Sequence, residues 1–196
     1  DAMLTRAGPV LFGESRDVLE TYRLFAHDPS WEARLVEAVR TGLSAEAAVD
    51  RVRREHRARL ESARDAMVRE RMHDLEDLEN RLLRQLNGDD GGREAPRGSI
   101  LVASRIGPAE LLEYRDSGLA GIALEEAGAG SHAAIVARAI GVPAVGGLTG
   151  LVTRAEAGAL TIIDGAAGTI HIRPEAAIVP NFHARLALAG QTQAAL

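Results

Sequence analysis

Residues 128–145 have the sequence GAGSHAAIVARAIGVPAV, and the rest of the chain is interpreted around them. Two glycines and Ser131 lead into an apolar helical pattern that begins at His132. Pro143 and the apolar residues after it predict a turn into a buried strand. The first turn of a helix offers unpaired N–H groups and the positive end of the helix dipole, which favour phosphate. A neutral imidazole placed there can act as a nucleophile and carry a phosphoryl group.

A purely structural role for His132 is the alternative. Ile135, Val136 and Ala139 follow it by three, four and seven residues, so they share its helix face and make that face apolar. A hydrogen-bonded histidine where the helix packs on a sheet has the same pattern. Arg138 lies about 240° around the helix from His132 and is expected to pair elsewhere.

The other histidines give no sign of a metal site. Four of them lie among charged residues and are predicted to be solvated: His27, His56, His73 and His183. His171 lies in a predicted strand without a visible partner. No two histidines have metal-ligand spacing with a carboxylate, so no metal site is predicted.

Composition limits the class of protein. The chain has 196 residues, 46% hydrophobic, with a formal net charge of -5 and no cysteine. This mild acidity offers no electrostatic footprint for nucleic acid. The lack of cysteine excludes disulfides and fits a reducing cytoplasm. No apolar run is long enough for a membrane span, and no signal peptide is visible. Because the first residue is Asp1 and not Met, we expect a piece of a longer protein.

The periodicity changes once along the chain. Residues 14–88 carry apolar positions at helical spacing, divided by Asp28-Pro29, Gly42 and Ser44, and predict a helical bundle. Residues 87–98, NGDDGGREAPRG, predict a linker. From Ser99 onward short apolar runs alternate with helical patterns, which is typical of an α/β fold. The polar, Ala-rich stretch from Pro180 predicts a final helix.

The stretch 128–145 resembles the phosphohistidine signature of PEP-utilising enzymes, which include enzyme I of the phosphotransferase system, pyruvate phosphate dikinase and PEP synthase. Residues 65–83, DAMVRERMHDLEDLENRLL, resemble the partner-binding helical subdomain of enzyme I. The Arg- and Ala-rich pattern is most similar to the nitrogen-branch form, the PtsP type. The resemblance implies an α/β fold class, in which a phosphohistidine swivelling β/β/α domain is combined with an inserted all-α helical bundle subdomain.

The same resemblance implies a domain organisation. Residues 1–88 would be the helical HPr/NPr-binding subdomain, 89–98 a linker, and 99–179 the phosphohistidine mobile domain. Residues 180–196 would be a linker helix to a PEP-binding barrel that this chain lacks. The chain alone is therefore expected not to react with phosphoenolpyruvate.

The resemblance also assigns roles at the histidine. His132 would take a phosphoryl group from phosphoenolpyruvate and pass it to a histidine of a small HPr/NPr-like carrier protein. Gly128, Gly130 and Ser131 would shape the turn around the phosphate. Two positions depart from the family pattern: Gly130 stands where Thr or Asn is usual, and Leu111 where sugar-branch members carry a Thr.

The helix at 14–27 and its neighbour would dock the carrier. Val18, Tyr22 and Phe25 are the expected exposed apolar anchors, because this helix has more apolar surface than one packing face needs. The alternative is that these three side chains belong to the core.

Further expectations follow from the resemblance. The full-length enzyme would be a cytoplasmic homodimer that uses Mg²⁺ through the missing PEP-binding domain, and this fragment would be a monomer without a cofactor. Neither nucleic acid nor a membrane is an expected partner. Two other functions stay open: the swivelling phosphohistidine domain of a pyruvate phosphate dikinase or PEP synthase type of enzyme, and a non-catalytic helical binding module.

Overall fold

The N-terminal region is helical in the computed structural model, which describes residues 13–62, 64–89 and 94–193. The helical part comprises α2 (Glu14–Ala26), α3 (Pro29–Arg40), α4 (Ala45–Ser62) and α5 (Ala66–Leu86). Local signals begin these helices where the sequence predicts. At α3 the Asp28 side chain accepts hydrogen bonds from the N–H groups of Ser30 and Trp31, at 2.8 and 3.0 Å, and Pro29 occupies the first turn.

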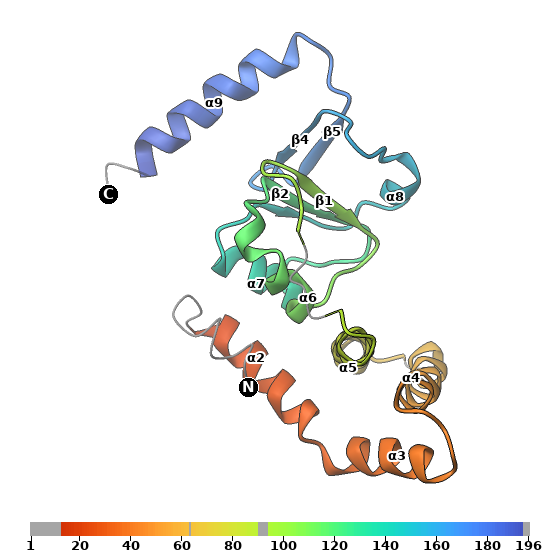
Figure 1. Cartoon of the computed structure of the whole chain (residues 1–196). Helices are drawn as coiled ribbons and strands as arrows, with labels where there is room; N and C mark the ends of the chain where they lie inside the picture. The colour runs from red at the N-terminus through yellow and green to blue at the C-terminus, as the bar shows by residue number, and fades with distance from the viewer. Residues whose placement is uncertain (1–12, 63, 90–93, 194–196) are drawn as a thin grey trace.

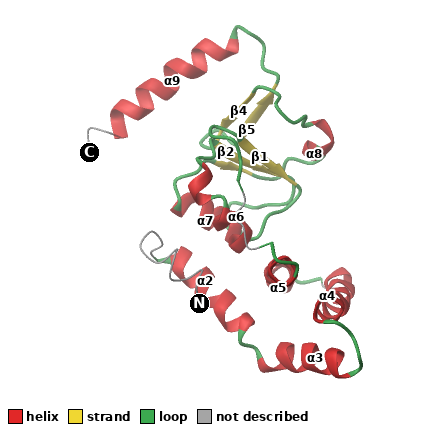
Figure 2. Ribbon diagram, viewed as in Figure 1, coloured by secondary structure: helices red, strands yellow, loops and turns green. Residues whose placement is uncertain are grey.

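The second region, the α/β part, contains two small sheets (Figure 2). Its elements are β1 (Ile100–Ala103), α6 (Pro108–Glu113), the 3₁₀ helix η1 (Arg115–Ser117), β2 (Gly121–Leu124), α7 (His132–Ala139), β3 (Ala144–Val145), α8 (Leu151–Arg154), β4 (Thr161–Asp164) and β5 (Thr169–Ile172). Strands β1, β2 and β3 form a parallel sheet in that order, with Ile122 opposite Leu101 and Ala144. Strands β4 and β5 form an antiparallel pair.

Helices α6 and α7 pack against the parallel sheet, and α2 and α5 lie against these two helices on the side away from it (Figure 1). Leu111 of α6, Ile122 of β2 and Val136 of α7 are all 0% exposed. The same buried cluster includes Val18 and Tyr22 from α2. The helical part and the α/β part therefore share one apolar core, which holds α2 and α5 beside the N-terminus of α7.

This shared core corrects one expectation about α2. Val18 and Tyr22 are 5% and 3% exposed, so the exposure predicted for them is wrong. Phe25 is half-buried. The wide apolar face of α2 contacts the α/β part as well as the other helices, which accounts for its excess of apolar residues.

The chain continues from β5 into α9 (Ile178–Gln193), the final helix expected from the sequence (Figure 1). The Arg185 guanidinium of α9 lies 2.9 Å from Asp164 Oδ2 at the end of β4 and ties the helix to the sheet pair. Within the described ranges, no helix combines the length and the apolar character that a bilayer-spanning helix needs.

Candidate functional site

The turn before α7 places His132 at the start of the helix. Ser131 is the N-cap residue, and its hydroxyl accepts a hydrogen bond from Ala134 N–H at 3.3 Å. A side chain added at Gly128 or Gly130 would meet nothing within 4 Å, so the turn is open on that side. Arg138 points back to the turn, where its guanidinium donates to the Ala129 carbonyl at 3.3 Å.

Helix α5 supplies two carboxylates to His132. Asp74 Oδ2 lies 2.7 Å from His132 Nδ1, and Glu70 Oε1 accepts a hydrogen bond from the His132 backbone N–H at 2.9 Å. The His132 side chain keeps 26% of its surface exposed, whereas Asp74 keeps 5%. The expectation of free N–H groups at the start of α7 needs correction, because Glu70 and Ser131 occupy those of His132 and Ala134 in this arrangement.

Behind Asp74 lies a second buried carboxyl group. The Tyr22 hydroxyl is 3.2 Å from Asp74 Oδ1 and 3.0 Å from Asp77 Oδ2. Asp77 Oδ2 also accepts a hydrogen bond from Ala109 N–H at 3.1 Å, at the start of α6. One connected set of polar groups thus joins α6, α5, α2 and α7.

Burial dominates the electrostatics of these groups. It raises the pKa of Asp74 to about 6, although His132 beside it favours the ionised form. It raises the pKa of Asp77 to about 7, and nearby Glu110 acts in the same direction. Burial, together with the two carboxyl groups, also raises the pKa of the Tyr22 hydroxyl. Both carboxyl groups therefore hold a proton more readily than an exposed aspartate does, and Asp77 more so than Asp74.

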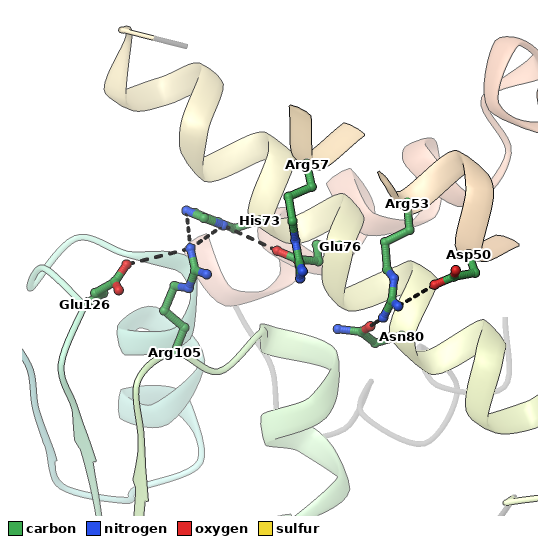
Figure 3. A network of polar contacts seen from close by, with 8 residues as sticks. All are labelled: Asp50, Arg53, Arg57, His73, Glu76, Asn80, Arg105 and Glu126. Carbon is green, nitrogen blue, oxygen red and sulfur yellow. Dashed lines mark hydrogen bonds and ion pairs between the residues drawn. The ribbon is translucent and has the colours of Figure 1, made fainter. Parts of the chain in front are cut away.

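A second polar contact links α5 to the α/β part beside this site (Figure 3). The Arg105 guanidinium, after β1, lies 3.0 Å from His73 Nδ1 and 3.7 Å from Glu126 Oε2. Glu76 pairs with Arg57 of α4 on the other side of His73. Partial burial, and then Arg105, lower the pKa of His73. Helix α5 is thus tied to the α/β part through Arg105 as well as through His132.

One predicted surface histidine is in fact in the interior of the helical part. His56 is 7% exposed and its Nδ1 lies 2.6 Å from Glu79 Oε1, which also accepts a 3.3 Å hydrogen bond from Trp31 Nε1. The prediction of a solvated His56 is therefore wrong, because α3 and α5 cover it.

The sequence singled out the turn at 128–132 but missed the carboxylates that contact it. Glu70, Asp74 and Asp77 lie three or four residues apart and so share one face of α5, a pattern that is available in the sequence. A solvated helix face carries acidic residues at the same spacing. Leu111, which departs from the Thr expected in the sugar branch, is 0% exposed and belongs to the core. The polar partner of His132 comes from α5 instead.

The described residues contain no group of three or more His, Asp or Glu side chains that could hold a metal ion. The two buried aspartates are engaged by Tyr22, His132 and the start of α6.

Sequence comparison places the two parts in one group of enzymes. Residues 2–71 match the family described as PEP-utilising enzyme, N-terminal, and residues 95–168 match the family described as PEP-utilising enzyme, mobile domain. Together the two matches cover most of the chain. The chain belongs to the PEP-utilising enzymes, and it carries their N-terminal and mobile domains.

Within that group the relatives are phosphotransferases. A phosphoenolpyruvate-protein phosphotransferase of Streptomyces coelicolor is 34% identical over 88% of this chain and 31% of its own length. One of Haloferax volcanii is 32% identical over 82% of this chain and 29% of its own length. A solution structure of an Enzyme I protein superposes with a TM-score of 0.61 and 26% identity, covering 93% of this chain and 75% of that one. The chain thus spans about a third of the length of these curated relatives.

Proposed function

We propose that this chain is the phosphohistidine-bearing part of a phosphoenolpyruvate-protein phosphotransferase, and that His132 relays a phosphoryl group to a histidine of an HPr/NPr-like carrier. The observation that carries this proposal is the 2.7 Å contact between His132 Nδ1 and Asp74 Oδ2 at the start of α7. An ionised carboxylate can only accept a hydrogen bond, so Nδ1 carries the proton. The Nε2 lone pair is then left for attack on phosphorus.

The chemistry is a two-step covalent transfer. Nε2 of His132 attacks the phosphorus of phosphoenolpyruvate, the N–P bond forms, and the O–P bond breaks to release enolpyruvate. The ring becomes positive while Nδ1 keeps its proton, and Asp74 stabilises that charge. In the second step a carrier imidazole attacks the same phosphorus and His132 returns to its neutral form.

In this structure Glu70 covers the backbone N–H group at the start of α7. Its carboxylate occupies the His132 N–H, where the oxygens of an incoming phosphoryl group would be stabilised. The Glu70 carboxylate and a phosphoryl group on His132 would repel each other at this N–H group. We infer that α5 and α7 separate at the start of α7 during transfer, which also allows His132 to meet its donor and its carrier in turn.

The outer surface of α2 and α3 supports docking of a carrier there. Its exposed apolar side chains are Leu24, Val36 and Val39, with 73%, 40% and 47% of their surface accessible. Leu24 follows buried Tyr22 by two residues, so it lies on the opposite side of α2. We propose these three residues, with half-buried Phe25, as the carrier contact in place of Val18 and Tyr22.

Label transfer tests the proposal. The chain is mixed with ³²P-phosphorylated HPr or with ³²P-phosphorylated NPr, and acid-labile, base-stable label on the chain is measured. We expect labelling from one carrier or both, and the preferred carrier distinguishes the sugar branch from the nitrogen branch. His132→Ala should abolish the label, whereas His27→Ala, which removes an exposed histidine of the helical part, should not. Label that survives His132→Ala, or no label from either carrier, contradicts the relay.

A further inference from the structure

The Tyr22 hydroxyl has one proton and two carboxyl neighbours. Its oxygen lies 3.2 Å from Asp74 Oδ1 and 3.0 Å from Asp77 Oδ2, and both aspartates are buried. The phenol can donate to only one of these oxygens, so the other contact is a hydrogen bond only if that carboxyl group is itself protonated. Two ionised carboxylates on either side of one buried hydroxyl would also repel each other. The geometry therefore calls for one shared proton on the pair.

The surroundings of the two aspartates differ, and they place this proton on Asp77. Asp74 faces His132, whose Nδ1 lies 2.7 Å away and favours an ionised partner, with Glu70 as the opposing neighbour on α5. Asp77 faces Glu110 of α6, a second acidic side chain. Among the described residues, its hydrogen-bond partners are the Tyr22 hydroxyl and backbone N–H groups at the start of α6, and none of these carries a positive charge.

The oxygen atoms of Asp77 agree with that placement. Asp77 Oδ1 is buried and has no hydrogen-bond partner among the described residues. An unpaired oxygen costs less on a neutral carboxyl group than on a carboxylate.

We propose that Tyr22 and Asp77 are positioning residues that keep Asp74 ionised opposite His132. Asp77 Oδ2–H donates to the Tyr22 oxygen, Tyr22 O–H donates to Asp74 Oδ1, and His132 Nδ1–H donates to Asp74 Oδ2. Each of these three protons then has one acceptor, and Nε2 of His132 keeps its lone pair. The inference rests on the proposed function, in which Nε2 is the atom that is phosphorylated.

The site would be impaired if the shared proton lay on Asp74 and Asp77 were ionised. If Asp77 ionises, it competes with Asp74 for the single proton of Tyr22. Asp74 then loses its second donor in a buried place and is more easily protonated. A protonated Asp74 that donates to Nδ1 leaves the ring proton on Nε2, which blocks the nucleophile. Moving the shared proton from Asp77 to Asp74 leaves the number of protons unchanged, so this tautomer balance is set by the surroundings of the two aspartates and not by the pH.

The tautomer of His132 can be observed directly by ¹H–¹⁵N correlation of ring nitrogens in the ¹⁵N-histidine-labelled chain, and this measurement needs no phosphoryl transfer. In the wild type we expect the Nδ1–H form to dominate from pH 6.5 to pH 8.5. Asp77→Asn keeps a neutral side chain beside Tyr22, so the Nδ1–H form should stay dominant there. In Tyr22→Phe the Nε2–H form should increase at every pH, and the rate of labelling by phosphorylated carrier should fall about tenfold.

The matched control is Glu113→Gln. Glu113 also joins α6 to α5, through a 2.7 Å contact with Arg81, but it has no contact with the Tyr22 network. Glu113→Gln should keep the wild-type tautomer.

The outcomes separate the two proposals. A wild-type tautomer ratio in Tyr22→Phe, an increased Nε2–H form in Asp77→Asn, or the same change in Glu113→Gln would overturn the positioning role. A chain that shows the expected tautomers but takes no label from either carrier refutes the relay and leaves the proton network standing. Asp77→Asn has nearly the same shape as the native residue, so the test holds even if Tyr22→Phe disturbs packing.

Discussion

Replacing Asp74 by Asn tests the feature on which the proposed phosphoryl transfer most depends. The side chain keeps its size in a place that is 4% exposed, so the packing of α5 is preserved. The change removes a charged partner from His132 Nδ1 at 2.7 Å. A hydrogen bond to a charged group contributes about 1.5–3 kcal/mol. At about 1.4 kcal/mol for each factor of ten, the rate of transfer should fall about 10- to 150-fold.

The tautomer explains why the loss appears in the rate. The Asn amide can turn its NH₂ group toward Nδ1, which favours the ring form with the proton on Nε2. That form has no lone pair at the reacting nitrogen. The initial rate of label transfer from phosphorylated carrier measures the effect under single-turnover conditions. Asp116→Asn is the matched control, because the Asp116 side chain is 88% exposed and pairs with Arg115 and not with His132.

Two results would refute this reasoning. The first is a rate within about twofold of the wild type in Asp74→Asn with unchanged far-ultraviolet circular dichroism. The second is an equal decrease in Asp116→Asn. Either would mean that the ring of His132 is positioned by something other than the carboxylate of α5.

Three further substitutions test how the buried groups contribute to stability. His56→Ala removes the imidazole partner of buried Glu79, which then keeps the 3.3 Å hydrogen bond from Trp31 Nε1, and it should cost about 3 kcal/mol in urea unfolding. A cost below about 1 kcal/mol contradicts the pairing. Gly107→Ala puts a Cβ where the Asp77 carboxyl group lies, so it should lower the melting temperature by several degrees, and an unchanged value would show that the contact is loose. The folded-state pKa of Asp77, about 7, exceeds its ordinary 3.8, so the folded chain retains a proton that the unfolded chain releases. The free energy of unfolding should therefore fall by up to about 1.4 kcal/mol per pH unit between pH 4 and 7, and this slope should be smaller in Asp77→Asn.

Much of the secondary structure could be predicted from short-range signals. Asp28 and Pro29 begin α3, and Ser131 caps α7, because each of these effects acts within one turn of helix. The alternation of strands and helices from residue 99 predicted the α/β part for the same local reason.

The errors concern burial. Tyr22 was expected on the surface because an apolar stripe does not say how many partners cover it. Asp74 and Asp77 were not recognised because acidic residues at helical spacing usually face solvent. Their burial depends on α2, α6 and α7, which lie in other segments of the chain.

The sequence by itself determined the position of the histidine, because a serine N-cap and the apolar residues after His132 act locally to begin α7 there. It also determined the family, through the stretch that contains this histidine. Only the tertiary structure decided the state of the imidazole. The Asp74 carboxylate that binds Nδ1 is 58 residues away in the chain, and the packing of α5 and α2 against α7 both brings it to the ring and excludes water from it. That packing places Nδ1 against the carboxylate, which in the proposed mechanism leaves Nε2 as the nucleophile.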